Sequence, residues 1–176
     1  MTTSAQLRKT ALSLPETAEE RTSTGTTAFT VGGRRFASTA GNEVHLHLPR
    51  AEAQQFLTAY PGARQSAAGV GVPLDDVDGQ RLNHWVRRAW LSQAPERLAA
   101  QAAAADTATA GDVGDLPKAI GRPATRALTA AGVTTLAQVA ELTEGELRAM
   151  HGVGPKAVGV LRATLAADGR SFKEAP

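Results

Sequence analysis

The stretch MHGVGPKA, residues 150–157, places two glycines around one valine and follows them with a proline and a lysine. Glycine tolerates positive φ, so Gly152 suits a tight turn. Pro155 suits the first turn of a helix, where its missing N–H removes no hydrogen bond. The stretch therefore predicts a turn that leads directly into a helix. Such a turn either only joins two helices or leaves backbone N–H groups available to a phosphate.

A weaker copy of this stretch lies 33 residues earlier in the chain. The segment IGRPATRAL, 120–128, aligns with VGPKAVGVL, 153–161, and each copy places a proline in the first turn of a predicted helix. The earlier copy reads AIG where the later one reads GVG, so it lacks one glycine. The repeat predicts two similar helical units that pack together.

The residues between the two copies predict two further helices. One covers TTLAQVAEL, 134–142. The other covers TEGELRAM, 143–150, where Thr143 is followed three residues later by Glu146, the pattern of a capping box. Together the four helices predict a compact all-α domain over 116–173.

The segment 116–173 resembles the C-terminal domain of the bacterial RNA polymerase alpha subunit, which is a tandem helix-hairpin-helix domain. In such domains the N–H groups at the start of the helix after a hairpin face a phosphate oxygen of DNA. The resemblance implies that Gly152 makes the turn and that Val153 fills the gap between the helices. The implied DNA-binding residues are Gly152, Val153, Gly154, Lys156 and Ala157 in the second hairpin and Gly121, Arg122 and Arg126 in the first.

Residues 1–98 predict an α+β domain. Helices are predicted over 5–14, over 50–59 and from Asp76 or Asp78 to about Ala94, and strands over 27–31, 34–40, 43–48 and 69–74. The pair Gly32-Gly33 predicts a two-residue hairpin between the first two strands. The order α-β-β-β-α-β-α predicts an antiparallel sheet with helices on one side.

An ordered series of blocks within this domain resembles the MmcQ/YjbR family. The blocks are LPETAEE (14–20), TAFTVGGRRFA (27–37), HLHLP (45–49), VPLDDVD (72–78) and WVRRAWLSQAPERLA (85–99). The resemblance implies a frataxin-like fold, also described as a double-wing DNA-binding arrangement. Four arginines form a candidate second DNA surface there, namely Arg34, Arg35, Arg87 and Arg88.

The segment 99–115 between the two domains has no large apolar residue until Val113 and no periodic pattern. We expect its alanines to extend the preceding helix by a turn or two, and we expect Thr107 to Asp115 to be flexible. The sequence therefore predicts a flexible linker over 99–115, which would let the two domains act as tethered modules.

Several functional classes are disfavoured by what the sequence lacks. There is no cysteine, which excludes disulfides, thiol catalysis and thiolate metal sites. No Ser-His-Asp order, glycine-rich phosphate loop or paired carboxylate set is recognisable. His45 and His47 lie two apart on a predicted strand, but no third metal ligand is placed beside them. No stretch reaches the roughly 18 apolar residues of a membrane span, so we expect a cytoplasmic protein.

The sequence thus predicts a non-enzymatic bacterial DNA-binding protein without a cofactor. The segment 116–173 carries eight Lys and Arg against four Asp and Glu, although the whole chain has a net charge of only +2. We expect it to contact the duplex phosphate backbone with little sequence specificity and to associate with the nucleoid. Two alternatives stay open. One is an adaptor that contacts transcription proteins through the polymerase-alpha-like domain, and the other is a first domain that binds a ligand or metal at His45 and His47.

Overall fold

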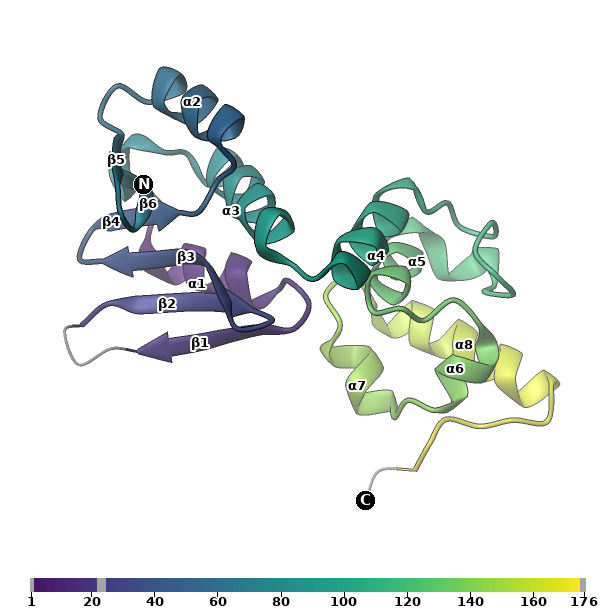
Figure 1. The fold of residues 1–176 in the computed structure, drawn as a ribbon. Helices are drawn as coiled ribbons and strands as arrows, with labels where there is room; N and C mark the ends of the chain where they lie inside the picture. The colour runs from purple at the N-terminus through teal and green to yellow at the C-terminus, as the bar shows by residue number, and fades with distance from the viewer. Residues whose placement is uncertain (1, 22–24, 175–176) are drawn as a thin grey trace. The chain divides into compact units, whose positions relative to one another are not determined.

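The computed structural model describes residues 2–21 and 25–174, and its contacts divide the chain into two compact units (Figure 1). We call Met1–Glu96 unit 1 and Arg97–Pro176 unit 2. The described elements comprise a six-stranded antiparallel sheet, all of it in unit 1, and eight α-helices shared between the units. The chain is therefore mixed α+β, as its sequence predicts.

Unit 1 contains the sheet and three α-helices. Its elements are α1 (Ser4–Leu12), β1 (Thr17–Arg21), β2 (Thr27–Val31), β3 (Arg34–Ala40), β4 (Glu43–Leu46), α2 (Arg50–Ala59), β5 (Arg64–Ser66), β6 (Gly69–Pro73), the 3-10 helix η1 (Leu74–Asp76) and α3 (Gly79–Gln93). The strands lie in the order β1-β2-β3-β4-β6-β5, and each neighbouring pair is antiparallel.

Local sequence signals set the turns and helix starts of unit 1. Gly32 and Gly33 have φ values of 55° and 74°, so both adopt the positive φ that a two-residue type I′ hairpin requires. The predicted hairpin between β2 and β3 is therefore confirmed. Asp78 caps α3, because its carboxylate accepts the Arg81 N–H at 2.9 Å.

The core of unit 1 lies between the sheet and its helices. In β4, Val44 and Leu46 are buried while His45 between them is half-buried, which shows the alternation expected of a strand with one covered face. The buried side of α3 packs on β3 and β4 and on α1. Trp90 of α3 is fully buried, and Trp85 packs edge-on against Phe56 of α2 with ring centroids 5.2 Å apart. Both tryptophans therefore serve packing.

Two strands of unit 1 are absent from the sequence prediction. Strand β1 has the sequence TAEER and pairs with β2 at one edge of the sheet, and β5 has the sequence RQS and pairs with β6 at the other. Neither has an apolar residue larger than alanine, so neither produces the hydrophobic alternation by which a strand is recognised. The predicted order α-β-β-β-α-β-α is therefore incomplete at both sheet edges.

Unit 2 is helical in all its described elements. They are α4 (Glu96–Thr107), which begins one residue before the unit boundary, the 3-10 helix η2 (Lys118–Ile120), α5 (Gly121–Ala130), α6 (Leu136–Ala140), α7 (Glu144–Ala149) and α8 (Pro155–Ala167). One buried cluster joins η2, α5, α6, α7 and α8, with Leu128, Val139, Leu147, Leu161 and Leu165 all fully inaccessible. The capping box of Thr143 and Glu146 is present, which confirms that prediction.

The segment predicted as a linker, 99–115, is helical over its run of alanines up to Ala105. Helix α4 covers its first nine positions, and Ala102 and Ala105 on this helix are buried. Alanine is the strongest helix former, and it packs closely without a large side chain, so the absence of large apolar residues does not prevent folding. The stretch from Ala108 to Pro117 is the part without α-helix. Between α3 and α4 the chain has only Ala94 and Pro95.

Candidate nucleic-acid interface

The second hairpin of unit 2 has the backbone that its sequence predicts. Gly152 adopts a φ of 100°, and the Val153 N–H donates to the Met150 carbonyl at 3.1 Å, which closes the turn. The Val153 side chain is 6% exposed and belongs to the buried cluster, so it fills the space between the helices. Gly154 then forms the N-cap of α8, and Pro155 is the first helical residue.

The start of α8 presents backbone donors without acceptors. Among the described residues, none accepts a hydrogen bond from the N–H groups of Gly154, Lys156 or Ala157, and Gly154 makes no side-chain cap. The first helical hydrogen bond is made by Val158, which donates to the Gly154 carbonyl at 3.1 Å. Helix α8 has 13 residues, so its dipole places partial positive charge at these amides. The arrangement suits a phosphate oxygen.

Gly154, at the start of α8, is exposed. A β-carbon built on Gly154 would meet no atom within 4 Å, which means that its backbone is accessible to a ligand. Lys156 is exposed, and no ion pair to it is formed by the described residues. Its ammonium group can therefore approach the same phosphate as the amides.

The first hairpin is built similarly but uses one of its donors internally. Gly121 has a φ of 79°, and its N–H donates to the Lys118 carbonyl. The Gly121 carbonyl in turn accepts the Thr125 hydroxyl at 3.0 Å. Arg122 is exposed beside this turn. The missing glycine of the first copy thus corresponds to a hairpin with fewer unused backbone donors.

The two hairpins lie next to each other within unit 2. A β-carbon at Gly152 would lie 3.0 Å from the Pro123 carbonyl oxygen and 3.5 Å from the Ala127 β-carbon, so the second hairpin packs on the first turns of α5. Helix α8 likewise packs on η2. Each hairpin region therefore contacts the helical region of the other copy.

The remaining cations of unit 2 differ in what they bind. Arg148 and Arg162 both form ion pairs with Glu144, and the Arg162 hydrogen bond is the main reason that the pKa of Glu144 is lowered. Arg126 is half-buried and donates to the Asp106 carbonyl in the last turn of α4. Its predicted role at DNA therefore competes with a contact inside unit 2.

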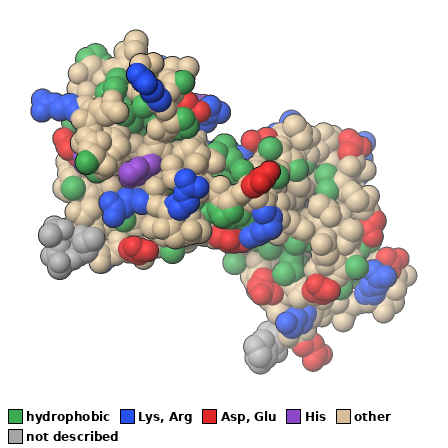
Figure 2. Space-filling model, viewed as in Figure 1, with side chains coloured by type: hydrophobic (Ala, Val, Ile, Leu, Met, Phe, Trp, Pro, Cys, Tyr) green, Lys and Arg blue, Asp and Glu red, His purple; other side chains and the backbone are tan. Residues whose placement is uncertain are grey.

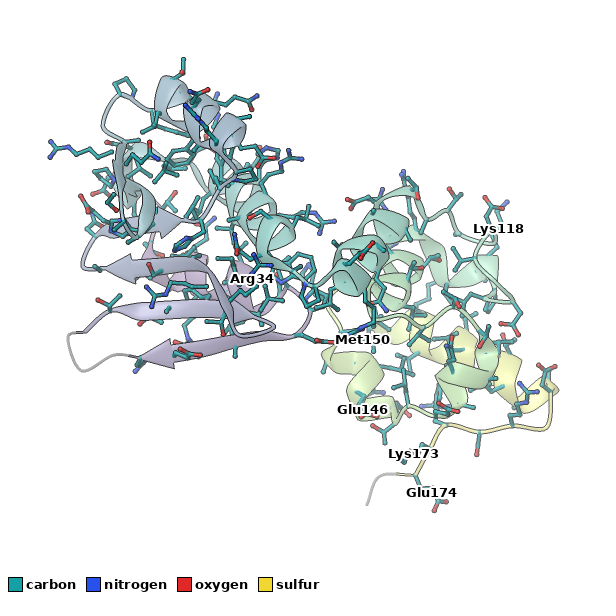
Figure 3. The ribbon with its side chains drawn as sticks, in the orientation of Figure 1. Arg34, Lys118, Glu146, Met150, Lys173 and Glu174 are labelled. Carbon is teal, nitrogen blue, oxygen red and sulfur yellow. The ribbon has the colours of Figure 1, made fainter. Side chains whose placement is uncertain are left out.

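Three cations lie at the hairpins with exposed side chains and no ion pair to another described residue, namely Lys118, Arg122 and Lys156. Figure 3 shows Lys118 at the periphery of unit 2, directed away from its helices. Lys118 is not among the residues that the resemblance assigns to DNA binding, although it lies two residues before Ile120 in the first copy of the repeat. These cations and the α8 amides form the candidate interface.

The four arginines proposed as a second DNA surface in unit 1 differ in exposure and in ion pairing. Arg34 and Arg35 are exposed at the start of β3, next to the hairpin (Figure 3). Arg88 of α3 forms an ion pair with Glu52 of α2, which neutralises its charge locally, and Arg87 is half-buried. The structure therefore leaves Arg34 and Arg35 as the exposed cations of this group without an ion pair to another described residue.

Basic and histidine side chains gather on the face of unit 1 that Figure 2 shows. His47 has a lowered pKa, first because it is partly buried and then because of the charge of Arg35. His45 Nε2 lies 3.6 Å from the Glu43 carboxylate, and its Nδ1 faces Gly71. Within residues 2–21 and 25–174, no group of three His, Cys, Asp or Glu forms a metal site, so the two histidines gain no third ligand.

No helix in the described part of the chain is long and apolar enough to cross a membrane. Comparison of the chain with family models, with curated proteins and with solved structures gives no match.

Proposed function

We propose that unit 2 binds duplex DNA without catalysing a reaction, and that it does so chiefly through the phosphate backbone. The observation that supports this most is the start of α8, where three N–H groups lack an acceptor beside an exposed lysine. This part of the proposal rests on the resemblance of 116–173 to the tandem helix-hairpin-helix domain of the RNA polymerase alpha subunit. The proposal that unit 1 belongs to the MmcQ/YjbR family likewise rests on sequence resemblance. We expect the protein to associate with the bacterial nucleoid.

The chemistry of the interface favours backbone binding over base recognition. Backbone amides and lysine bind phosphate oxygens, which carry no sequence information. Base recognition in the major groove needs side chains such as Arg, Asn or Gln held toward base edges. Of the exposed cations at the hairpins only Arg122 has a bidentate group. We therefore expect weak sequence specificity and strong dependence on salt.

Unit 1 has a secondary place in this proposal. Its exposed Arg34 and Arg35 offer a weak second contact with DNA or with another protein. A second site on the same chain raises the apparent affinity through effective concentration only if both sites reach the duplex together.

The proposal is tested by the affinity of the full chain for a fluorescent duplex at two salt concentrations. Lys156→Glu reverses one charge at the second hairpin and is expected to weaken binding by about tenfold, as expected for loss of a phosphate contact plus like-charge repulsion. Arg170→Glu changes the charge by the same amount beyond the far end of α8, at an exposed position of the same unit. If both variants weaken binding equally, or if the native chain does not bind near physiological salt, the proposal is wrong.

A further inference from the structure

A cavity of about 360 Å³ opens in unit 1 between the first turns of α1 and the adjacent side of the sheet. Its walls come from α1 and from strands β1, β2 and β3. The side chains that define its chemistry are Ser4, Ala5, Arg8, Glu19, Arg21 and Thr27. A cavity of this size lies within the range of small-molecule sites.

The sheet register explains why these side chains meet. Arg21 lies opposite Thr27, and Glu19 lies opposite Phe29 in the antiparallel pair of β1 and β2. Residues two apart on a strand point to the same face, so all four side chains project toward α1. Arg8 reaches the same place from the helix, because its guanidinium contacts Glu19.

Glu19 positions Arg8 but accepts hydrogen bonds from only some of the N–H donors of the guanidinium. Arg8 Nε lies 3.0 Å and 2.8 Å from the two carboxylate oxygens, and its Nη2 lies 2.8 Å from Oε2. The guanidinium carries five N–H donors, and its Nη1 makes no such contact with Glu19. The hydrogen bond from Arg8 also lowers the pKa of Glu19, so the carboxylate stays charged at neutral pH.

Positive charge remains in the cavity after this pairing. Arg21 Nε is 3.7 Å from Glu19, so two arginines share one carboxylate. The hydroxyls of Ser4 and Thr27 add donors, whereas Glu19 is the only carboxylate in the lining. The methyl group of exposed Ala5 adds apolar surface to the lining, whereas the ring of Phe29 is fully buried beneath it.

We propose that this cavity binds a small organic anion whose carboxylate or phosphate group is held by Arg8 and Arg21 and whose apolar part lies beside Ala5. Guanidinium groups bind both kinds of anion through charge-assisted hydrogen bonds. This site is separate from the proposed DNA interface, which lies in unit 2.

The test is a titration of the ¹⁵N-labelled full chain with phenyl phosphate, benzoate and inorganic phosphate, followed by NMR. Saturable shifts are expected at the amides of Ser4, Arg8, Arg21 and Thr27, with a dissociation constant of about 1 mM or lower for phenyl phosphate or benzoate. The stronger of these two ligands identifies the anionic group. Inorganic phosphate should bind more weakly, because it has no apolar part.

Arg21→Gln is the decisive variant, because its side chain is 76% exposed and its loss leaves the Arg8–Glu19 pair in place. It is expected to weaken binding by about fivefold or more. Thr27→Phe, which fills the cavity and keeps every charge, should also abolish the shifts. Arg64→Gln, on exposed strand β5 outside the cavity, is the matched control.

Two results would overturn the proposal. One is the absence of saturable shifts with all three ligands, and the other is equal weakening by Arg21→Gln and Arg64→Gln. Lys156→Glu should leave anion binding unchanged, since it alters only unit 2. Failure of the DNA proposal and failure of this one are therefore distinguishable.

Discussion

Gly152 lies against Pro123, so closely that a β-carbon on the glycine would be 3.0 Å from the proline carbonyl oxygen. Gly154, two residues later, has no atom within 4 Å of the same constructed position. The φ of Gly152 is 100°, whereas that of Gly154 is −87°, a value that any residue adopts. The two glycines of GVG therefore differ in surroundings, since the first packs against α5 and the second lies at the open start of α8.

Gly152→Ala is expected to destabilise unit 2 by roughly 1–3 kcal/mol, because alanine is strained at this φ and its methyl group crowds Pro123. Gly154→Ala should change the free energy of unfolding little and should weaken DNA binding, because its methyl group adds bulk to the exposed start of α8. Urea unfolding and duplex affinity measured on both variants check the pair. Equal loss of stability would contradict the assignment of separate roles.

Arg122 and Arg126 are also expected to differ in role, one affecting duplex affinity and the other stability. Arg126 donates to the Asp106 carbonyl at the C-terminal end of α4, where a cation also interacts favourably with the helix dipole. Arg126→Ala should therefore lower the free energy of unfolding by about 1 kcal/mol with little effect on duplex affinity. Arg122→Ala should do the reverse, weakening binding while the stability stays the same. A larger effect of Arg126→Ala on affinity than on stability would show that the contact with α4 is released at DNA.

The sequence predicts the helices of unit 2 well because their signals are local. Thr143 and Glu146 mark a helix start by themselves, and Gly152 and Gly121 mark turns that need positive φ. The sequence does not predict which residues each hairpin packs against. That Gly152 packs on Pro123, or that Arg126 reaches the carbonyl of Asp106, depends on how separate helices pack, and no pattern within either segment contains that information.

Unit 1 shows where local signals fail. Strands β1 and β5 are held in place by partners, β2 and β6, rather than by their own composition. The cavity beside β1 is therefore outside what the sequence predicts, because Arg21 and Glu19 belong to a strand that hydrophobic alternation does not mark. The burial of helix α4 is unmarked for the same reason, since alanine provides helix propensity without the large side chains that signal burial.

Asp115 is expected to stabilise the start of α6 from outside that helix. Its carboxylate accepts the Leu136 N–H at 2.6 Å, while Thr135 forms a capping box with Gln138 at the same end. Asp115→Ala removes an acceptor from a half-buried amide and should lower the free energy of unfolding by about 1 kcal/mol. Asp112→Ala, at an exposed loop position nearby, is the control for the loss of a negative charge. Equal effects of the two variants would attribute the change to charge alone.

Acid should destabilise the chain through three paired glutamates. The pKa of Glu19 is lowered chiefly by Arg8, that of Glu144 by Arg162 and that of Glu146 by the Thr143 backbone, each from an ordinary value of 4.5. A lowered pKa in the folded state means that the unfolded chain takes up protons first as the pH falls. The stabilisation is therefore complete above the ordinary value and is lost as the pH falls through the folded pKa.

Urea unfolding measured from neutral pH down to about pH 3 should show this decline below roughly pH 4.5. Glu144→Gln should reduce the steepness, because one of the protonating groups is removed. Glu141→Gln, at an exposed position of the same unit, is the matched control. A pH dependence that is the same in Glu144→Gln as in the native chain would contradict the role of the Arg148 and Arg162 pairs.

Salt dependence of duplex binding should reveal whether both hairpins contact the same DNA. Each phosphate neutralised by a cation adds about 0.9 to the slope of log affinity against log salt concentration. Lys156→Gln and Lys118→Gln are each expected to lower that slope by about one, and the double variant by about two. Because the hairpins lie next to each other, one duplex can reach both. If Lys118→Gln leaves the slope unchanged while Lys156→Gln lowers it, the second hairpin binds DNA alone. The unused amides at the start of α8 would then account for this difference between the hairpins.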